Sequence, residues 1–121
     1  MNTFEFTVDG VRYSVNDDNT TVTVAGYPTG SKPKGDLTIP ESVTYGGISY
    51  PVTSIGSNAF DGCSGLTRID AYPNPEKVRT GEDAFDGVPK DGTLHVLPKY
   101  LSAYRTASQW CEFTNIKGDL T

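Results

Sequence analysis

The same turn-rich phrase occurs twice in this chain, 25 residues apart. The repeated positions are Gly56, Ala59, Phe60, Asp61 and Gly62, which recur as Gly81, Ala84, Phe85, Asp86 and Gly87. The same spacing relates Ile69 and Ala71 to Leu94 and Val96. A period in the twenties, with a short strand and a turn-rich return in each unit, is typical of coils that stack. Because each coil buries its apolar side against the next, the repeat predicts a short solenoid.

The phenylalanine of each copy is expected to hold the coils together. Burying one such ring contributes about 1.5–3 kcal/mol, so Phe60 stacked on Phe85 should form the spine of the core. Gly62 and Gly87 supply the backbone freedom for the bend into the next strand. The strand after each copy then alternates between inward apolar and outward polar side chains.

The first half of the chain reads as strands and turns. Runs of alternating apolar and polar residues, separated by short polar turns, predict a three-stranded antiparallel meander over residues 4–24. The acidic pair Asp17 and Asp18 is expected to be a solvated part of a turn rather than a cation site. A loop and a short strand ending at Pro40 follow. Two further runs joined by Gly46-Gly47 predict a tight hairpin.

An amphipathic helix is predicted after Pro98, within residues 99–121. Apolar or small residues recur every three or four positions along one stripe, at Leu101, Tyr104, Ser108 and Cys111. Such a helix would cover the open edge of the last coil. Tyr104 and Trp110 could suggest a carbohydrate platform, but their place on the apolar stripe favours core packing.

Composition argues against several classes of protein. The net charge is −5 and the basic residues are scattered, whereas binding a phosphate backbone requires a concentrated basic stripe. No window approaches the ~18 apolar residues of a membrane-spanning helix. The first ten residues lack the pattern of a signal peptide. A chain of 121 residues is expected to form one domain.

The residues that carry chemistry are few and separated. The period places His95, the single histidine, beside Asp70 on the neighbouring strand, which predicts a surface cross-strand pair. No nucleophile motif accompanies this pair. Cys63 is expected to face inward, and Cys111 lies 48 positions further on, so no zinc set assembles locally. No catalytic residue, metal site or cofactor site is therefore predicted.

Four stretches resemble the BspA-like leucine-rich repeat family. They are "LTIPESV", "IGSNAFDGCSGLTRI", "DAFDGVPKDGTLHV" and "YLSAYRTASQWCEFTNI". The family consists of extracytoplasmic bacterial proteins. Three departures from its pattern are Thr80 and Val88 in the second phrase and the shifted Pro98.

The resemblance implies a β-rich α+β fold, namely a short leucine-rich-repeat solenoid between two caps. The expected single domain, residues 1–121, divides into three parts. These are an N-terminal antiparallel β-meander cap at 1–36, repeat coils at 37–98 with a hairpin insertion at 43–53, and a C-terminal helical cap at 99–121.

The implied function is a non-catalytic protein-interaction or adhesion module of a bacterial surface or secreted protein. Its partner would be a protein or glycan on a host or microbial surface, bound by a monomer. The outward strand residues are the candidate binding residues: Arg68, Asp70, Tyr72, Thr93 and His95. Two alternatives stay open, a structural spacer or cap within a larger surface protein, and a glycan-binding module that uses Tyr27, Tyr72 or Tyr100.

Overall fold

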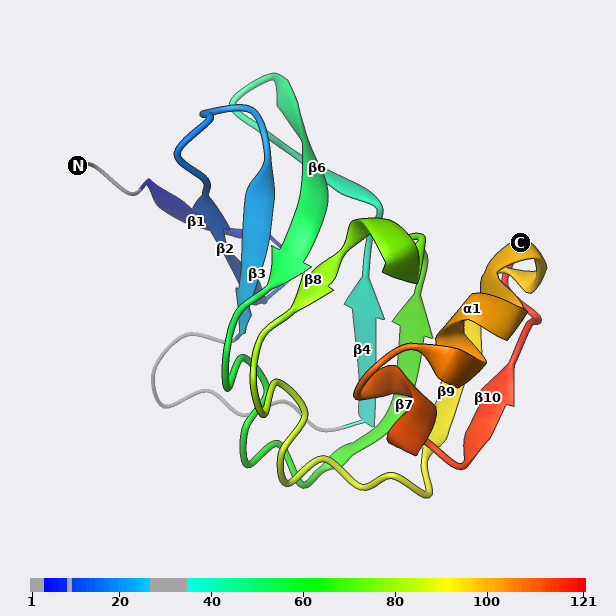
Figure 1. Cartoon of the computed structure of the whole chain (residues 1–121). Coiled ribbons are helices and arrows are strands. Elements are labelled where there is room, and N and C mark those ends of the chain that lie inside the picture. The colour runs from blue at the N-terminus through cyan, green and yellow to red at the C-terminus, as the bar shows by residue number, and fades with distance from the viewer. Residues whose placement is uncertain (1–3, 9, 27–34) are drawn as a thin grey trace.

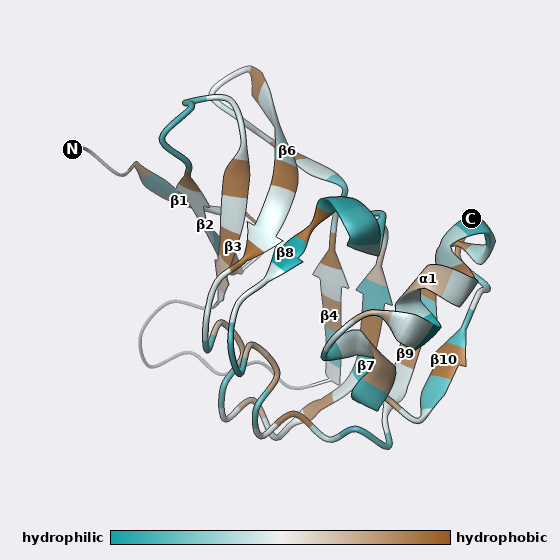
Figure 2. Cartoon of the chain, viewed as in Figure 1, coloured by the Kyte–Doolittle hydropathy of each residue, from teal (hydrophilic) through white to brown (hydrophobic). Residues whose placement is uncertain are grey.

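The computed structural model describes residues 4–8, 10–26 and 35–121. These residues form two sheets that lie side by side, with one short α-helix against the second sheet (Figure 1). Hydrophobic and hydrophilic stretches alternate along several strands (Figure 2). This alternation reflects one face of each sheet turned toward the core. Tyr27, one of the candidates for glycan binding, lies outside the described residues.

The first sheet begins with the predicted meander. Strands β1 (Glu5–Val8), β2 (Val11–Val15) and β3 (Val22–Gly26) pair antiparallel in sequence, which confirms the prediction. Strand β6 (Ile48–Ile55) joins β3 in parallel, and the two-residue strand β8 (Arg79–Thr80) joins β6 in parallel.

The hairpin at Gly46-Gly47 is confirmed. Strand β5 (Ser42–Tyr45) pairs antiparallel with β6, and Gly46 and Gly47 both have positive φ, at 61° and 82°. Such φ values are the ones that a tight two-residue hairpin requires at its central positions.

The second sheet is entirely parallel. Its order is β4, β7, β9 and β10, and the bounds are β4 (Gly35–Ile39), β7 (Leu66–Ala71), β9 (Thr93–Val96) and β10 (Asn115–Lys117). The predicted register between β7 and β9 is confirmed, because Ile69 pairs with Leu94 and Ala71 pairs with Val96. All four side chains are buried.

The two copies of the repeated phrase lie directly against each other. Backbone N–H groups of Asn58, Phe60 and Gly62 donate to carbonyls of the second copy, at 2.9, 2.8 and 2.8 Å. The rings of Phe60 and Phe85 stack with centroids 5.7 Å apart and planes 13° apart. Both rings are almost fully buried, which confirms the predicted aromatic spine.

The stack contains two copies and does not extend into the predicted solenoid. Two units are fewer than the three or more that solenoids usually require for stability. Other elements complete the core instead. The antiparallel strands β1, β2 and β5 extend the first sheet, and the C-terminal segment closes the second.

The prediction of a capping helix over the last coil is wrong in its length and place. A 3-10 turn (Pro98–Tyr100) leads into α1 (Leu101–Thr106), and a second 3-10 turn (Trp110–Glu112) follows. The helix ends because Ala107 is extended and Gln109 has φ of 71°. Two predicted members of the buried stripe, Ser108 and Cys111, are consequently exposed.

The outer edge of β9 is covered by strand β10, which pairs with it in parallel. Tyr104 and Trp110 are buried, as the sequence predicts for core residues. The Tyr104 hydroxyl donates to the Pro73 carbonyl at 2.5 Å, which ties α1 to the segment before the 3-10 turn Pro75–Lys77. Burial raises the pKa of the Tyr104 hydroxyl, so the group remains a donor at neutral pH.

The close stacking of the two copies requires a glycine at position 81. A Cβ at Gly81 would lie 2.4 Å from the Ser57 nitrogen, so Gly81→Ala forces two backbones apart and should cost about 1–3 kcal/mol of unfolding free energy. Its counterpart Gly56 is the matched control, because its Cβ would meet the Val24 carbonyl at 3.4 Å. Urea denaturation of both alanine variants checks the prediction. An equal loss in both would show that the close approach at Gly81 is unimportant.

Tyr104→Phe should destabilise the protein by about 1–3 kcal/mol, because it leaves the buried Pro73 carbonyl without its donor. Tyr100→Phe serves as the control, since Tyr100 is only half-buried and its hydroxyl makes no side-chain hydrogen bond to the described residues. Thermal unfolding measures both. Equal melting temperatures for the two variants would contradict a role for the Tyr104 bond.

Asp18 caps its turn instead of being merely solvated. Its Oδ1 accepts from the backbone N–H groups of Thr20 and Thr21, and its Oδ2 accepts from the Thr21 hydroxyl. These hydrogen bonds lower the pKa of Asp18 to about 2, and the bond from the Thr20 N–H has the largest effect. The folded pKa of Asp18 lies below the unfolded value of about 3.9. The ionised carboxylate therefore stabilises the folded state fully above about pH 3.9, and this stabilisation is lost as the pH falls through about 2.

We therefore expect Asp18→Asn to be less stable than the parent at pH 5, and the difference to vanish as the pH approaches 2. Chemical denaturation across this range measures it. Asp17→Asn, at the adjoining exposed carboxylate, should follow the parent at every pH. A stability difference for Asp18→Asn that does not change with pH would rule out the cap as its cause.

Candidate interaction surface on the parallel sheet

The structure brings the five predicted binding residues together on the second sheet. Arg68 pairs with Thr93, and Asp70 pairs with His95, in the parallel register of β7 and β9. Their intervening neighbours on both strands are buried, so these four side chains occupy the outer face. Tyr72 follows directly after β7 and is half-buried.

Two rows of outward residues cross the whole sheet. The first row runs Asp36, Arg68, Thr93, Asn115, and the second runs Thr38, Asp70, His95, Lys117. Thr38 is therefore the next rung beside Asp70, as predicted. The rows are polar from edge to edge, so the outer face presents hydrogen-bonding groups at strand spacing, about 4.8 Å.

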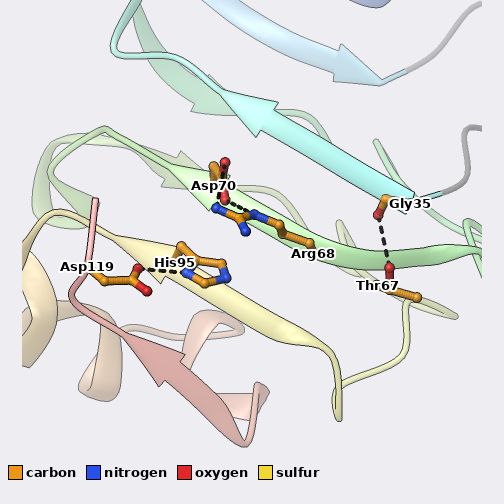
Figure 3. A network of polar contacts seen from close by, with 6 residues as sticks. All are labelled: Gly35, Thr67, Arg68, Asp70, His95 and Asp119. Carbon is orange, nitrogen blue, oxygen red and sulfur yellow. Dashed lines mark hydrogen bonds and ion pairs between the residues drawn. The ribbon is translucent and has the colours of Figure 1, made fainter. Parts of the chain in front are cut away.

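Arg68 and Asp70 form an ion pair along β7 (Figure 3). The Arg68 Nε donates to the Asp70 carboxylate at 2.8 Å, and the side chains are 45% and 19% exposed. This hydrogen bond raises the pKa of Arg68. Arg68 is the most exposed of the charged candidates, whereas Asp70 is largely occupied by its neighbour.

The predicted side-chain pairing of Asp70 with His95 is wrong, although their strand register is correct. His95 Nδ1 lies 2.6 Å from the carboxylate of Asp119, which follows β10 (Figure 3). Asp70 instead faces Arg68 on its own strand, because the Arg68 side chain lies nearer to it. Hydrogen bonding from His95 lowers the pKa of Asp119. The His95 side chain is only 11% exposed.

Sequence reasoning missed several residues of this surface, among them Asn115 and Asp119 of the C-terminal segment. Asn115 donates to the Thr93 hydroxyl at 3.0 Å. Both belong to the C-terminal segment that was predicted as helix, so no strand register was assigned to them. The one available signal in the sequence was the alternation of polar and apolar residues at 115–117, shortly after the aromatic residues Trp110 and Phe113.

The side chains that could hold a metal ion or act as nucleophiles are dispersed over the described residues. Across the described part of the chain, no three His, Cys, Asp or Glu side chains gather in a way that could hold a metal ion. Cys63 is buried, as expected, and Cys111 is exposed. Among the same residues no helix has the length and apolar character to cross a membrane.

Comparison with known proteins gives relatives at the level of structure. No family model matches the sequence, and no curated protein matches it. A leucine-rich repeat protein from Bacteroides ovatus superposes with a TM-score of 0.61 at 33% identity, over 78% of this chain and 23% of that one. A leucine-rich cell surface protein from Faecalibacterium prausnitzii superposes with a TM-score of 0.56 at 25% identity. The superposition covers 77% of this chain and 23% of that one.

A leucine-rich repeat protein from Bacteroides capillosus, 24% identical, shares the fold with a TM-score of 0.52 over 71% of its length. The chain spans about a quarter of the first two relatives. The chain is therefore similar in structure to bacterial leucine-rich repeat proteins, in agreement with its resemblance to the BspA-like family.

Proposed function

We propose that this chain is a non-catalytic protein-interaction module of a bacterial surface or secreted protein, which binds through the outer face of β7 and β9. The observation that carries the proposal is the grouping of Arg68, Tyr72 and Thr93 on one rigid parallel sheet. Tyr and Arg are the residue types that most often anchor protein interfaces. The relatives with leucine-rich repeats support interaction as the general role.

The arrangement of charge defines the kind of partner that fits. Asp70 is paired with Arg68, and the Asp119 carboxylate is hydrogen-bonded to His95, so both carboxylates already have a partner within the face. Remaining donors on Arg68 and Asn115, together with the Tyr72 ring, suit a partner of mixed polar and aromatic character. The face is small, so binding by one copy is expected to be weak unless several copies are tethered together.

The domain organisation that we propose is the predicted one, with an N-terminal β cap at 1–36, repeat coils with a hairpin insertion at 37–98 and a C-terminal cap at 99–121. A structural spacer in a larger surface protein is the second candidate. It is favoured by one observation, namely that Asp70 and Asp119 already have partners in Arg68 and His95. A spacer would need no free binding groups on that face.

Binding measurements separate the two roles. The chain is immobilised and exposed to surface-protein extracts of gut bacteria and of host epithelium. The double variant Arg68→Ala/Tyr72→Ala should reduce the affinity for a captured protein about tenfold or more, since each anchor contributes over about 1 kcal/mol. The matched control Arg79→Ala/Tyr100→Ala, which lies off this face, should bind as the parent does. Capture of no protein by any of the three would favour the spacer, whereas equal capture by all three would place the binding site elsewhere.

A further inference from the structure

The large exposed hydrophobic side chains gather at one place on the first sheet, away from the outer face of β7 and β9. Among the described residues they are Phe4, Tyr45 and Ile48, with exposures of 49%, 43% and 54%. The Phe4 and Tyr45 rings lie 5.6 Å apart. Tyr45 and Ile48 are direct cross-strand partners in the β5–β6 hairpin, so the three side chains form one patch, here the aromatic patch.

The aromatic patch is held rigid from behind. Phe6, itself buried, stacks on Tyr45 with centroids 4.4 Å apart and planes 7° apart. Phe6 also contacts the rings of Tyr13 and Tyr50. The backbone of Phe4 is fixed because its carbonyl accepts from the Val15 N–H at 2.8 Å. A partner would therefore meet a surface that loses little conformational freedom on binding.

Charge and area together restrict what this patch can bind. Residues 42–50 contain no charged side chain, and Glu5 points to the opposite side of β1 from Phe6. A patch without cations does not suit nucleic acid or an anionic membrane. Thr44 and Ser49 lie on the other face of the hairpin, so within the described aromatic patch only Tyr45 carries a hydroxyl group that could hydrogen-bond a sugar.

The same patch is too small for a stable dimer. Side chains of this size have about 150–250 Å² of surface, and half of three such side chains is roughly 300 Å². Stable interfaces bury about 800 Å² on each partner. The area instead matches a single anchoring side chain with the residues on either side of it. The neutral aromatic surface also has the composition of the core of a protein interface.

We propose that the aromatic patch binds an uncharged apolar side chain, aromatic or aliphatic, presented by a peptide segment of a protein partner. This contact is separate from the proposed binding face on β7 and β9. It gives the module a second point of attachment on its other sheet. A lysine introduced into the patch abolishes the contact, because its ammonium group would have to lose its water against aromatic rings that offer no carboxylate.

A phage-displayed library of random twelve-residue peptides tests the proposal with the whole chain as bait. The selected peptides should carry aromatic or aliphatic residues without net charge. Their affinity should fall at least tenfold in Ile48→Lys and stay unchanged in Thr44→Lys, which places the same charge on the opposite face of the same hairpin. Circular dichroism and melting temperature confirm that both variants fold. Arg68→Ala/Tyr72→Ala should bind the peptides normally, which distinguishes this contact from the proposed function.

Four results would overturn the proposal: no enriched peptide, enrichment of charged peptides, equal loss of binding in both lysine variants, or loss in Arg68→Ala/Tyr72→Ala alone. Sedimentation and binding to phosphatidylcholine vesicles complete the test. If Ile48→Lys abolishes concentration-dependent dimers or vesicle binding while no peptide is selected, the occupant is a second copy or a lipid surface, and the proposal is wrong.

Discussion

The stacking of Phe60 on Phe85 determines where nearly everything else in this protein lies. The two rings share one dry column, and the backbone hydrogen bonds beside them set the spacing of the two copies. That spacing places β7 next to β9 and β6 next to β8, one pair in each sheet. The outer face of the parallel sheet is thus a consequence of a contact buried several residues away from it.

Much of the fold follows from local rules, which is why the sequence predicts it. Alternation and glycine pairs specify the meander and the β5–β6 hairpin, and the 25-residue offset specifies the register of β7 with β9. The C-terminal segment was not predictable in the same way. Its helical stripe is real over Leu101–Thr106, but the positive φ of Gln109 redirects the chain into an edge strand. That choice depends on contacts with Gly81 and Ala84, which no local pattern reveals.

On the candidate face, too, the strand register follows from the sequence whereas the side-chain partners do not. Strand pairing correctly places Asp70 beside His95, yet each side chain bonds elsewhere, to Arg68 and to Asp119. Register fixes which backbone positions pair across two strands, whereas a long side chain can reach several neighbours. Residues that arrive from a distant segment, as Asp119 does, are therefore the hardest members of a surface to foresee.

The amide of Gln109 makes the two copies of the repeated phrase differ in how their turns are closed. In the first copy the Ala59 N–H donates to the Gly56 carbonyl directly. In the second copy the Gln109 side chain is interposed, because its Oε1 accepts from Ala84 and its Nε2 donates to the Gly81 carbonyl. One side chain from the C-terminal segment thus bridges the two ends of the second turn, which the first copy joins with its own backbone. The last turn of the pair therefore depends for its closure on a residue that lies 25 positions beyond Ala84.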